Sequence, residues 1–404
     1  MHGGDVYRNN VKYDFSISVN PLGMPQAVKE AALAAVSDAE KYPDIRCESL
    51  RRTISDKFGC APETVVCGNG ASELISAFLR MACQPYATNA ANLMNAAAST
   101  ESGGAGIVTR LLLLAPCFTG YEAAFRAVGE QFGAACDFSD YRDSLKFFPL
   151  LEKNNFSFTR EMLPAFLEKL RTTKPAACIV TNPNNPNGKL VERAVLEEIA
   201  SECEKTGTWL LIDECFMELT GKAGEYSFIP LLSRYKSVIV LRAFTKTFAI
   251  PGLRLGYCVT SSEETADALK SLLPEWNVSS PAQAAGVAAV HEDAYLKEAV
   301  RLICEERQFL AMELKKLGFT VFPSDANFLL FRVDSRANGA DCCSSEGSLF
   351  DALLEDGILI RDCRDFAGLG EGFYRIAVRK HADNVALVAS LQQICGKNGE
   401  NGDN

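Results

Sequence analysis

The chain has 404 residues, of which 48% are hydrophobic and 23% are charged, and its formal net charge is −10. This composition is that of a globular enzyme and excludes an intrinsically disordered chain. The acidic balance argues against a nucleic-acid or anionic-membrane surface, and no run of about 20 apolar residues could span a bilayer. Because the polar start also lacks a signal-peptide pattern, we expect a cytoplasmic protein.

Two residue types restrict the chemistry further. The chain has only three histidines, His2, His291 and His381, and none lies in a recognisable motif. Its 15 cysteines are dispersed and form no C-x-x-C pair. We therefore expect reduced thiols rather than a disulfide framework, and no metal site. Proton transfer would have to use Lys, Tyr, an acid or a cofactor.

The first two thirds of the chain alternate short apolar runs with helical patterns. Fully apolar strands alternating with helices predict an α/β fold with a mostly parallel sheet covered on both faces. We assign this region to a large domain of residues 46–275. The expected strands are Val65–Cys67, Leu111–Ala115, Cys178–Thr181, Trp209–Asp213, Val238–Arg242 and Arg254–Thr260, and the expected helices include Ser72–Met81, Val191–Lys205 and Glu263–Leu272.

The pattern changes after residue 275 and predicts a smaller α+β domain of residues 276–404, which the N-terminal segment 1–45 would join. Two polar, Gly-containing segments, Ala87–Gly106 and Ser335–Ser348, are expected to be exposed loops. The expected elements are a long helical stretch Pro281–Leu317, strand Asn327–Val333, helix Ser348–Asp356, strands Gly357–Arg361 and Tyr374–Val378, and a last helix Asp383–Cys395.

The strongest chemical signal lies at the ends of two expected strands. Asp213 ends the apolar run WLLID, where α/β proteins bind ligands. Lys246 follows the next strand, with Thr245 before it and Arg254 after it. This set matches the needs of pyridoxal 5′-phosphate (PLP): a lysine that bonds the aldehyde, an acid that keeps the ring nitrogen protonated, and groups that hold the phosphate.

Other segments fit the same cofactor, although each alone is also compatible with an ordinary turn or core position. In CGNGASEL the amides of Ala71 and Ser72 would face an anion at the start of a helix. Asn185 lies in the turn TNPNNPNG, where its amide could bond the phenolic O3′ of PLP. Phe118 in APCFTGY could stack on the pyridine ring.

This combination resembles the class I/II aminotransferases of PLP fold type I over about residues 1–395, and NPNNPNG, Asp213 and TKTFAIPGLRLGY carry the resemblance. Within that family, DECFMEL, VLRAFTKTFAIPGLRLGY and ILIRDCRDFAGLGEGFYRIAVR are similar to the L-threonine-O-3-phosphate decarboxylases of cobalamin biosynthesis and to the related histidinol-phosphate aminotransferases. The resemblance implies a large domain with a mostly parallel sheet, covered by helices, and a smaller α+β domain.

The resemblance also implies a role for each matching residue. Lys246 and Asp213 would be catalytic, bonding the aldehyde and pairing with the ring nitrogen. Tyr42 would reach the PLP phosphate of a second subunit, which implies a homodimer with shared active sites. Arg375 would bind the substrate carboxylate. The remaining cofactor contacts would be Ala71, Ser72, Thr245 and Arg254 at the phosphate, Asn185 at O3′ and Phe118 at the ring, and the substrate side would be lined by His2, Asn20 and Arg361, which would contact a substrate phosphate.

Two reactions remain open. In a PLP enzyme, the substrate Cα bond that stands perpendicular to the pyridine plane is the one that breaks. A carboxylate out of this plane would leave as carbon dioxide, whereas a carboxylate held near the plane would lead to loss of the Cα proton and transamination with 2-oxoglutarate. Phe216 stands where histidinol-phosphate aminotransferases usually carry Tyr, whereas SSPAQ is closer to general aminotransferases. We favour the decarboxylase. A non-catalytic ligand-binding protein would lack Lys246 or Asp213, and a dinucleotide-dependent oxidoreductase would need G-x-G-x-x-G after its first strand.

Overall fold

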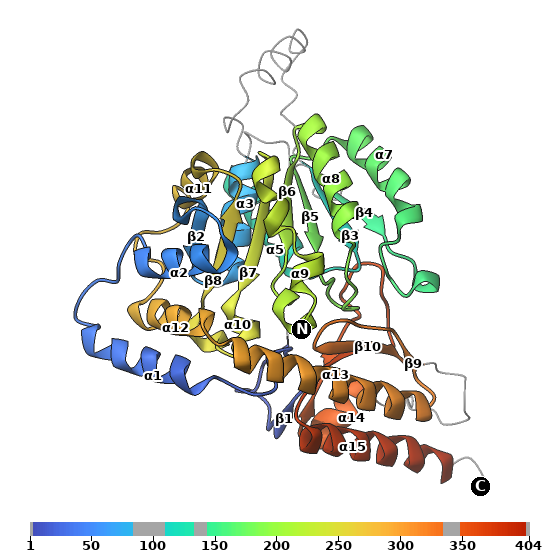
Figure 1. Ribbon diagram of the computed structural model, residues 1–404. Helices are drawn as coiled ribbons and strands as arrows, with labels where there is room; N and C mark the ends of the chain where they lie inside the picture. The colour runs from blue at the N-terminus through green and yellow to red at the C-terminus, as the bar shows by residue number, and fades with distance from the viewer. Residues whose placement is uncertain (1–2, 84–109, 133–143, 334–347, 401–404) are drawn as a thin grey trace.

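The computed structural model describes residues 3–83, 110–132, 144–333 and 348–400 (Figure 1). His2, the expected loop Ala87–Gly106 and nearly all of the expected loop Ser335–Ser348 lie outside these residues. Within them, no helix is both long and apolar enough to cross a membrane. The twelve cysteines in this part of the chain are all free, and no group of three or more His, Cys, Asp or Glu side chains there is arranged to hold a metal ion.

A seven-stranded sheet forms the centre of the larger part of the molecule, in the order β2-β8-β7-β6-β5-β3-β4. Only β8 runs antiparallel to its neighbours, which confirms the mostly parallel α/β sheet. The strands are β2 (Val65–Gly68), β3 (Leu111–Ala115), β4 (Leu145–Pro149), β5 (Ala177–Thr181), β6 (Trp209–Asp213), β7 (Val238–Ala243) and β8 (Gly256–Thr260).

Both faces of this sheet are buried because its strands are apolar on both sides. In β3, Leu112 and Leu114 face one core, while Leu111 and Leu113 face the other. Strands buried on both faces need a layer of helices on each side. One layer contains α2 (Glu48–Phe58), α7 (Leu163–Thr173), α8 (Arg193–Thr206) and α12 (Ser280–Val290), and the other contains α3 (Ala71–Cys83), α5 (Gly120–Phe132) and α11 (Glu263–Lys270).

The smaller part lies below the large sheet in Figure 1 and has its own core. Four antiparallel strands pair in the order β12-β13-β10-β9, and β1 (Tyr13–Asp14) pairs in parallel with β11 (Ile358–Leu359). The N-terminal segment therefore joins the C-terminal third of the chain. The other elements of the smaller part are α13 (Asp293–Lys316), β9 (Thr320–Val321), β10 (Phe328–Arg332), α14 (Leu349–Glu355), β12 (Arg361–Asp362), β13 (Phe373–Ala377) and α15 (His381–Glu400). Helix α1 (Gln26–Ala35) packs against α12, and its buried Val28 and Ala32 belong to a core of the large sheet.

Short helical segments connect these elements. Two of them, α9 (Ala223–Tyr226) and α10 (Phe244–Thr247), follow β6 and β7 at the edge of the sheet where the site is built. The 3₁₀ segments are Val36–Asp38, Pro62–Thr64, Glu152–Asn154, Arg160–Met162, Met217–Thr220, Ile229–Arg234 and Pro251–Leu253.

Besides the two-residue strands β1 and β9, which were not expected, the structure differs from the expected elements chiefly in three places. Strand β4 was not expected, because it lies at the sheet edge and only Leu145 of its five residues is buried. The stretch Pro281–Leu317 is two helices, α12 and α13, separated at His291–Glu292. The expected strand Gly357–Arg361 is divided into β11 and β12, which pair with different partners. The domain boundaries near residues 45 and 275 stay a prediction.

Candidate active site

A cavity of about 290 Å³ lies beyond the carboxyl ends of β5, β6 and β7, beside the first turn of α3. The carboxyl ends of parallel strands are the usual ligand-binding edge of an open α/β sheet. The cavity gathers residues that are far apart in the sequence. Of the expected site residues, Ala71, Ser72, Phe118, Asn185, Asp213, Thr245, Lys246, Arg254, Arg361 and Arg375 line it.

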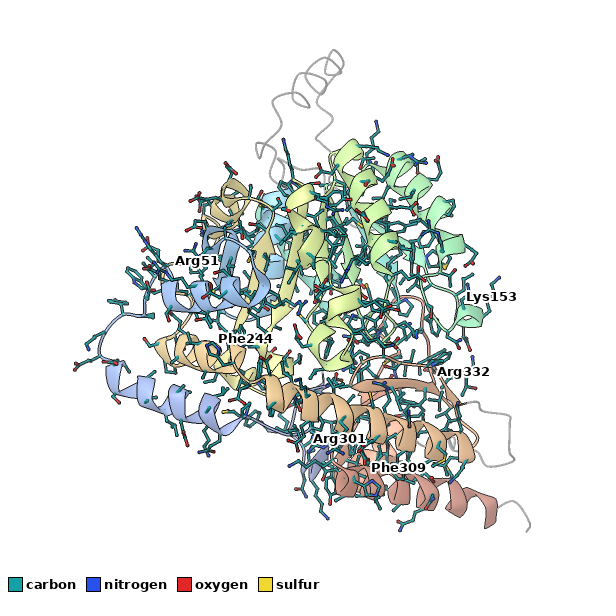
Figure 2. The ribbon with its side chains drawn as sticks, viewed as in Figure 1. Arg51, Lys153, Phe244, Arg301, Phe309 and Arg332 are labelled. Carbon is teal, nitrogen blue, oxygen red and sulfur yellow. The ribbon has the colours of Figure 1, made fainter. Side chains whose placement is uncertain are left out.

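Lys246 lies on the short helix α10, directly after β7. Phe244 anchors this helix, since its ring lies 5.7 Å from that of Phe248 and 5.3 Å from that of Tyr257, near α12 (Figure 2). Burial, with a smaller effect from the charge of Arg375, lowers the pKa of Lys246 to about 8. The lowered pKa increases the neutral fraction of the amine near physiological pH, and the neutral amine is the form that attacks an aldehyde.

Asp213 ends the neighbouring strand β6, where it is only 5% exposed. Its carboxylate accepts a 2.7 Å hydrogen bond from the Tyr121 hydroxyl and a 2.9 Å hydrogen bond from the Cys215 amide. Burial raises the pKa of Asp213, and these two hydrogen bonds oppose the rise. A buried carboxylate that has no cationic partner among the described residues is suited to a cationic ring nitrogen.

Tyr121 is a site residue that the sequence pattern did not predict, although it follows Phe118 by three residues in the segment APCFTGY. Its hydroxyl also lies 3.0 Å from the Thr181 hydroxyl, so it links the ends of β5 and β6. The intervening Gly120 is required by packing, because a Cβ atom there would lie 2.2 Å from a ring atom of Phe118. Because Gly120 has no side chain, the Phe118 ring can lie against its backbone and line the cavity.

The start of α3 forms a cradle for an anion. Gly70 has φ of +80°, and a Cβ atom there would lie 2.5 Å from Nη2 of Arg254. A Cβ atom on Gly256 would lie 2.9 Å from the amide nitrogen of Ala71. The two glycines thus let a guanidinium and a helix N-terminus approach the same point. Free amides, the helix dipole and an arginine together form a phosphate site.

Arg375, in β13, is 8% exposed and its hydrogen-bond partners among the described residues are neutral. It donates to Oδ1 of Asn185 and, at 2.9 Å, to the carbonyl oxygen of Ser16. Its Nε is buried and has no hydrogen-bond partner in the described part of the chain. Burial, together with the nearby Arg361, lowers the pKa of Arg375 to about 10. This guanidinium is suited to a carboxylate ligand.

Arg361, in β12, is 5% exposed and also lines the cavity. Its guanidinium lies 4.9 Å above the ring of Phe366. Unlike Arg375, it has an internal acidic partner, because Nη2 donates to both carboxylate oxygens of Asp365 at 2.8 Å. Besides Arg254, the cavity therefore presents two arginines, one held by neutral groups and one held by an acid.

Two of the expected site residues that the structure describes, Tyr42 and Asn20, do not line the cavity. Tyr42 is 78% exposed, and its ring lies 4.7 Å from that of Trp276. The side chain of Asn20 is occupied by backbone groups, since it donates to the carbonyl of Thr247 and accepts from the amide of Leu22. Asn20 therefore supports the segment that carries Lys246 instead of facing the substrate side. His2 lies outside the described residues.

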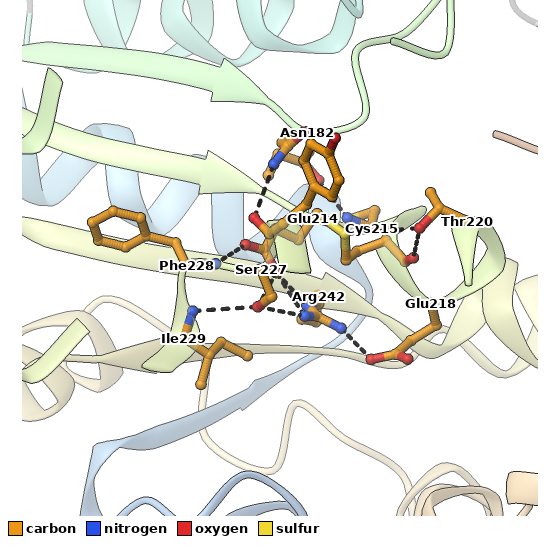
Figure 3. Close-up of polar contacts among 12 residues, drawn as sticks. Asn182, Glu214, Cys215, Glu218, Thr220, Ser227, Phe228, Ile229 and Arg242 are labelled. Carbon is orange, nitrogen blue, oxygen red and sulfur yellow. Dashed lines mark hydrogen bonds and ion pairs between the residues drawn. The ribbon is translucent and has the colours of Figure 1, made fainter. Parts of the chain in front are cut away.

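A buried ionic network supports the site from the residues that adjoin Asp213 and Lys246 (Figure 3). Arg242, in β7, forms a 2.6 Å ion pair with Glu214, the residue after Asp213, and also pairs with Glu218. Glu214 accepts further hydrogen bonds from the Phe228 amide at 2.7 Å and the Ser227 hydroxyl at 2.8 Å. The network thereby ties the ends of β6 and β7 together.

The residues of the cavity fit PLP on three independent grounds. The glycine-permitted cradle at α3 suits its phosphate, the buried carboxylate of Asp213 suits its ring nitrogen, and the lowered pKa of Lys246 suits its aldehyde. Asn185 and Phe118 line the space between these groups. When bound there, PLP supplies an electron sink for negative charge at the substrate Cα.

Comparisons with known proteins agree with this geometry. The family model for class I and II aminotransferases matches residues 10–89 and 135–391. The threonine-phosphate decarboxylase of Salmonella typhimurium is 30% identical, over 94% of this chain and 90% of that protein. The histidinol-phosphate aminotransferase structure from Clostridium acetobutylicum is 27% identical, with a TM-score of 0.77, and the match covers 95% of this chain and 99% of that one.

The solved histidinol-phosphate aminotransferase from Sinorhizobium meliloti contains pyridoxal 5′-phosphate. It is 20% identical to this chain, with a TM-score of 0.75 and a match that covers 96% of this chain and 91% of that one, so it bears on the fold. The sequence match, the fold and the cavity lead to one conclusion. The chain belongs to the class I and II aminotransferase family, with PLP fold type I and PLP as its cofactor.

Proposed function

We propose that this PLP-dependent enzyme decarboxylates a small phosphorylated amino acid, as an L-threonine-O-3-phosphate decarboxylase of cobalamin biosynthesis does. The observation that carries the proposal is the pair Arg375 and Arg361, which line the same cavity as Lys246. Two guanidinium groups suit a substrate with a carboxylate and a second anionic group. The similarity to the threonine-phosphate decarboxylase of Salmonella typhimurium supports this choice.

The roles of the residues follow from their chemistry. Arg375 would bind the substrate carboxylate, and the orientation that it imposes decides whether carbon dioxide or the Cα proton leaves. Lys246, whose pKa is lowered to about 8, can hold a proton and deliver it to Cα after carbon dioxide leaves. Asp213 would keep its negative charge opposite the ring nitrogen. The hydrogen bond from Tyr121 fixes the position of that carboxylate.

The alternative is a histidinol-phosphate type aminotransferase that uses 2-oxoglutarate and glutamate. The similarity to the Clostridium acetobutylicum structure favours this second function. In that reaction Lys246 would remove the Cα proton, with the same Arg375 and Asp213. Phe216 counts against this alternative, because its ring, which packs 5.1 Å from that of Phe328, carries no hydroxyl where histidinol-phosphate aminotransferases usually have Tyr.

One experiment distinguishes these functions. Purified holoenzyme is incubated with L-threonine phosphate, L-serine phosphate or histidinol phosphate, with and without 2-oxoglutarate. Carbon dioxide released without a keto acid supports the decarboxylase, whereas glutamate formed only with 2-oxoglutarate supports the aminotransferase. If none of these compounds reacts, the proposed phosphorylated substrate is wrong.

We further propose a homodimer in which Tyr42 reaches the PLP phosphate of the partner subunit. Tyr42 is exposed and does not line the cavity of its own subunit. Trp276, which contacts the Tyr42 ring, is also exposed, and so are the apolar residues Leu33, Val36 and Ile45, which are close to Tyr42 in the sequence. A cluster of exposed apolar side chains is typical of an association surface. Sedimentation analysis should show a dimer, and a Tyr42→Phe variant should bind PLP more weakly if Tyr42 contacts the phosphate of the partner subunit.

The cytoplasmic location stays a prediction.

A further inference from the structure

The two arginines on the substrate side of the cavity are held in different ways. Arg375 donates to an amide oxygen of Asn185 and to a backbone carbonyl, and both of these partners are neutral. Arg361 donates to both carboxylate oxygens of Asp365 at 2.8 Å. A ligand anion can therefore bind Arg375 directly, whereas at Arg361 it meets a carboxylate that is already bound.

In the ion pair between Arg361 and Asp365, the loop after β12 determines which of the two side chains can move. The Arg361 side chain is 6% exposed, and a further hydrogen bond to the Asp362 carbonyl and the contact with Phe366 hold it. The Asp365 side chain is 37% exposed, so its carboxylate approaches the guanidinium from the solvent side. Water can solvate Asp365 when it leaves, but the arginine remains fixed in the cavity wall.

The surroundings of Asp365 include a second acid. Burial and, to a smaller extent, the charge of Asp365 raise the pKa of Glu122 on α5, while Arg126 opposes the rise. The negative charge of Asp365 thus acts on Glu122 as well as on Arg361. An anion that binds Arg361 would compete with the Asp365 carboxylate for the same donors.

We infer that Asp365 is a displaceable counter-ion of Arg361 that weakens binding of the second anionic group of the substrate. It neutralises the buried arginine while the cavity is empty, and it gives way when an anion takes its place. Asp365 would therefore determine how strongly the enzyme favours a phosphorylated amino acid over the same amino acid without phosphate. The inference rests on the proposed function in placing the second anionic group at Arg361.

The test compares two neutralising substitutions in one loop, Asp365→Asn and Asp362→Asn. Asp362 is a matched control because its carboxylate pairs with Arg364 at 2.6 Å and not with Arg361. Titration calorimetry measures the affinity of each holoenzyme for inorganic phosphate. We expect Asp365→Asn to bind phosphate about tenfold more tightly, since a competing charge-assisted partner is gone, and Asp362→Asn to stay within about twofold of wild type.

The Arg361→Gln background localises the effect. There Asp365→Asn should give no gain in phosphate affinity, whereas a gain that persists would place the anion elsewhere and overturn the inference. Unchanged or weaker binding in Asp365→Asn alone would also overturn it, because Asp365 would then only hold Arg361 in position. Phosphate binding can be measured even if no phosphorylated amino acid is a substrate, so failure of the proposed function is recognised separately.

Steady-state kinetics provide a second readout if L-threonine phosphate is a substrate. In Asp365→Asn the KM for L-threonine phosphate should fall by about the same tenfold factor, while the affinity for L-threonine stays unchanged because it has no second anionic group. A parallel change for both amino acids would contradict a role in recognising charge.

Discussion

The buried pair Arg242–Glu214 gives the sharpest prediction for stability. The two side chains are 3% and 0% exposed, and their closest nitrogen–oxygen distance is 2.6 Å. Substitution Arg242→Met leaves Glu214 buried without its cation, and loss of one partner of such a pair costs about 3–5 kcal/mol. The exposed pair Arg234–Glu197, at 3.2 Å, provides the control, since Arg234→Met should cost less than about 1 kcal/mol.

Urea denaturation of the apoenzyme, followed by circular dichroism, measures both variants without the contribution of bound PLP. Burial raises the pKa of Glu214 and Arg242 opposes this rise, so Arg242→Met raises that pKa further. Protonation removes the buried charge, so the loss of stability should be smaller at pH 5 than at pH 8.

A second substitution tests the cause of the effect. Adding Glu214→Gln to Arg242→Met removes the unpaired charge and keeps an acceptor for the Phe228 amide, so most of the lost stability should return. If Arg242→Met costs no more than Arg234→Met, or if Glu214→Gln restores nothing, the assignment of Arg242 as the counter-ion of Glu214 is wrong.

Three further predictions concern the site itself. The rate at which apoenzyme combines with PLP should rise with pH and level off above about 8, because the pKa of Lys246 is lowered to that value; a rise that continues toward pH 10 would contradict it. Tyr121→Phe removes the 2.7 Å hydrogen bond to Asp213 and should weaken PLP binding about tenfold, measured by equilibrium dialysis; unchanged affinity would show that this bond does not support the cofactor site. Arg375→Lys loses the planar two-donor group and should raise KM for the amino acid by about 30-fold or more with unaltered PLP binding; a KM within about twofold of wild type would remove Arg375 from substrate binding.

The sequence predicted the parts of this protein that depend on local pattern. Strands such as β6 are apolar on both faces, and therefore Trp209–Asp213 could be assigned without tertiary information. Strand β4 could not be assigned in this way, because its residues are only partly buried. The break between α12 and α13 was not predicted, because the sequence has a helical pattern on both sides of it. The break depends on tertiary packing, since α12 contacts α1 and α2 whereas α13 contacts α15.

The site was predictable where the chemistry of a residue type is restrictive. An aspartate at the end of one strand and a lysine after the next strand indicated PLP, and the structure brings both into one cavity. The partners of these groups depend on three-dimensional proximity. The tyrosine at 121 reaches Asp213 across 92 residues of sequence, so no local signal marks it. Asn20 illustrates the reverse case, since its motif does not reveal that backbone groups occupy its amide.

Lys246 is expected to form the covalent bond to PLP. Borohydride reduction of the holoenzyme would make that bond permanent, and mass spectrometry of the digested protein would locate it. We expect a pyridoxyl group on the peptide that contains Lys246, and no such group in the Lys246→Ala variant. A pyridoxyl group on a different lysine of the wild-type enzyme, or on none, would contradict the account.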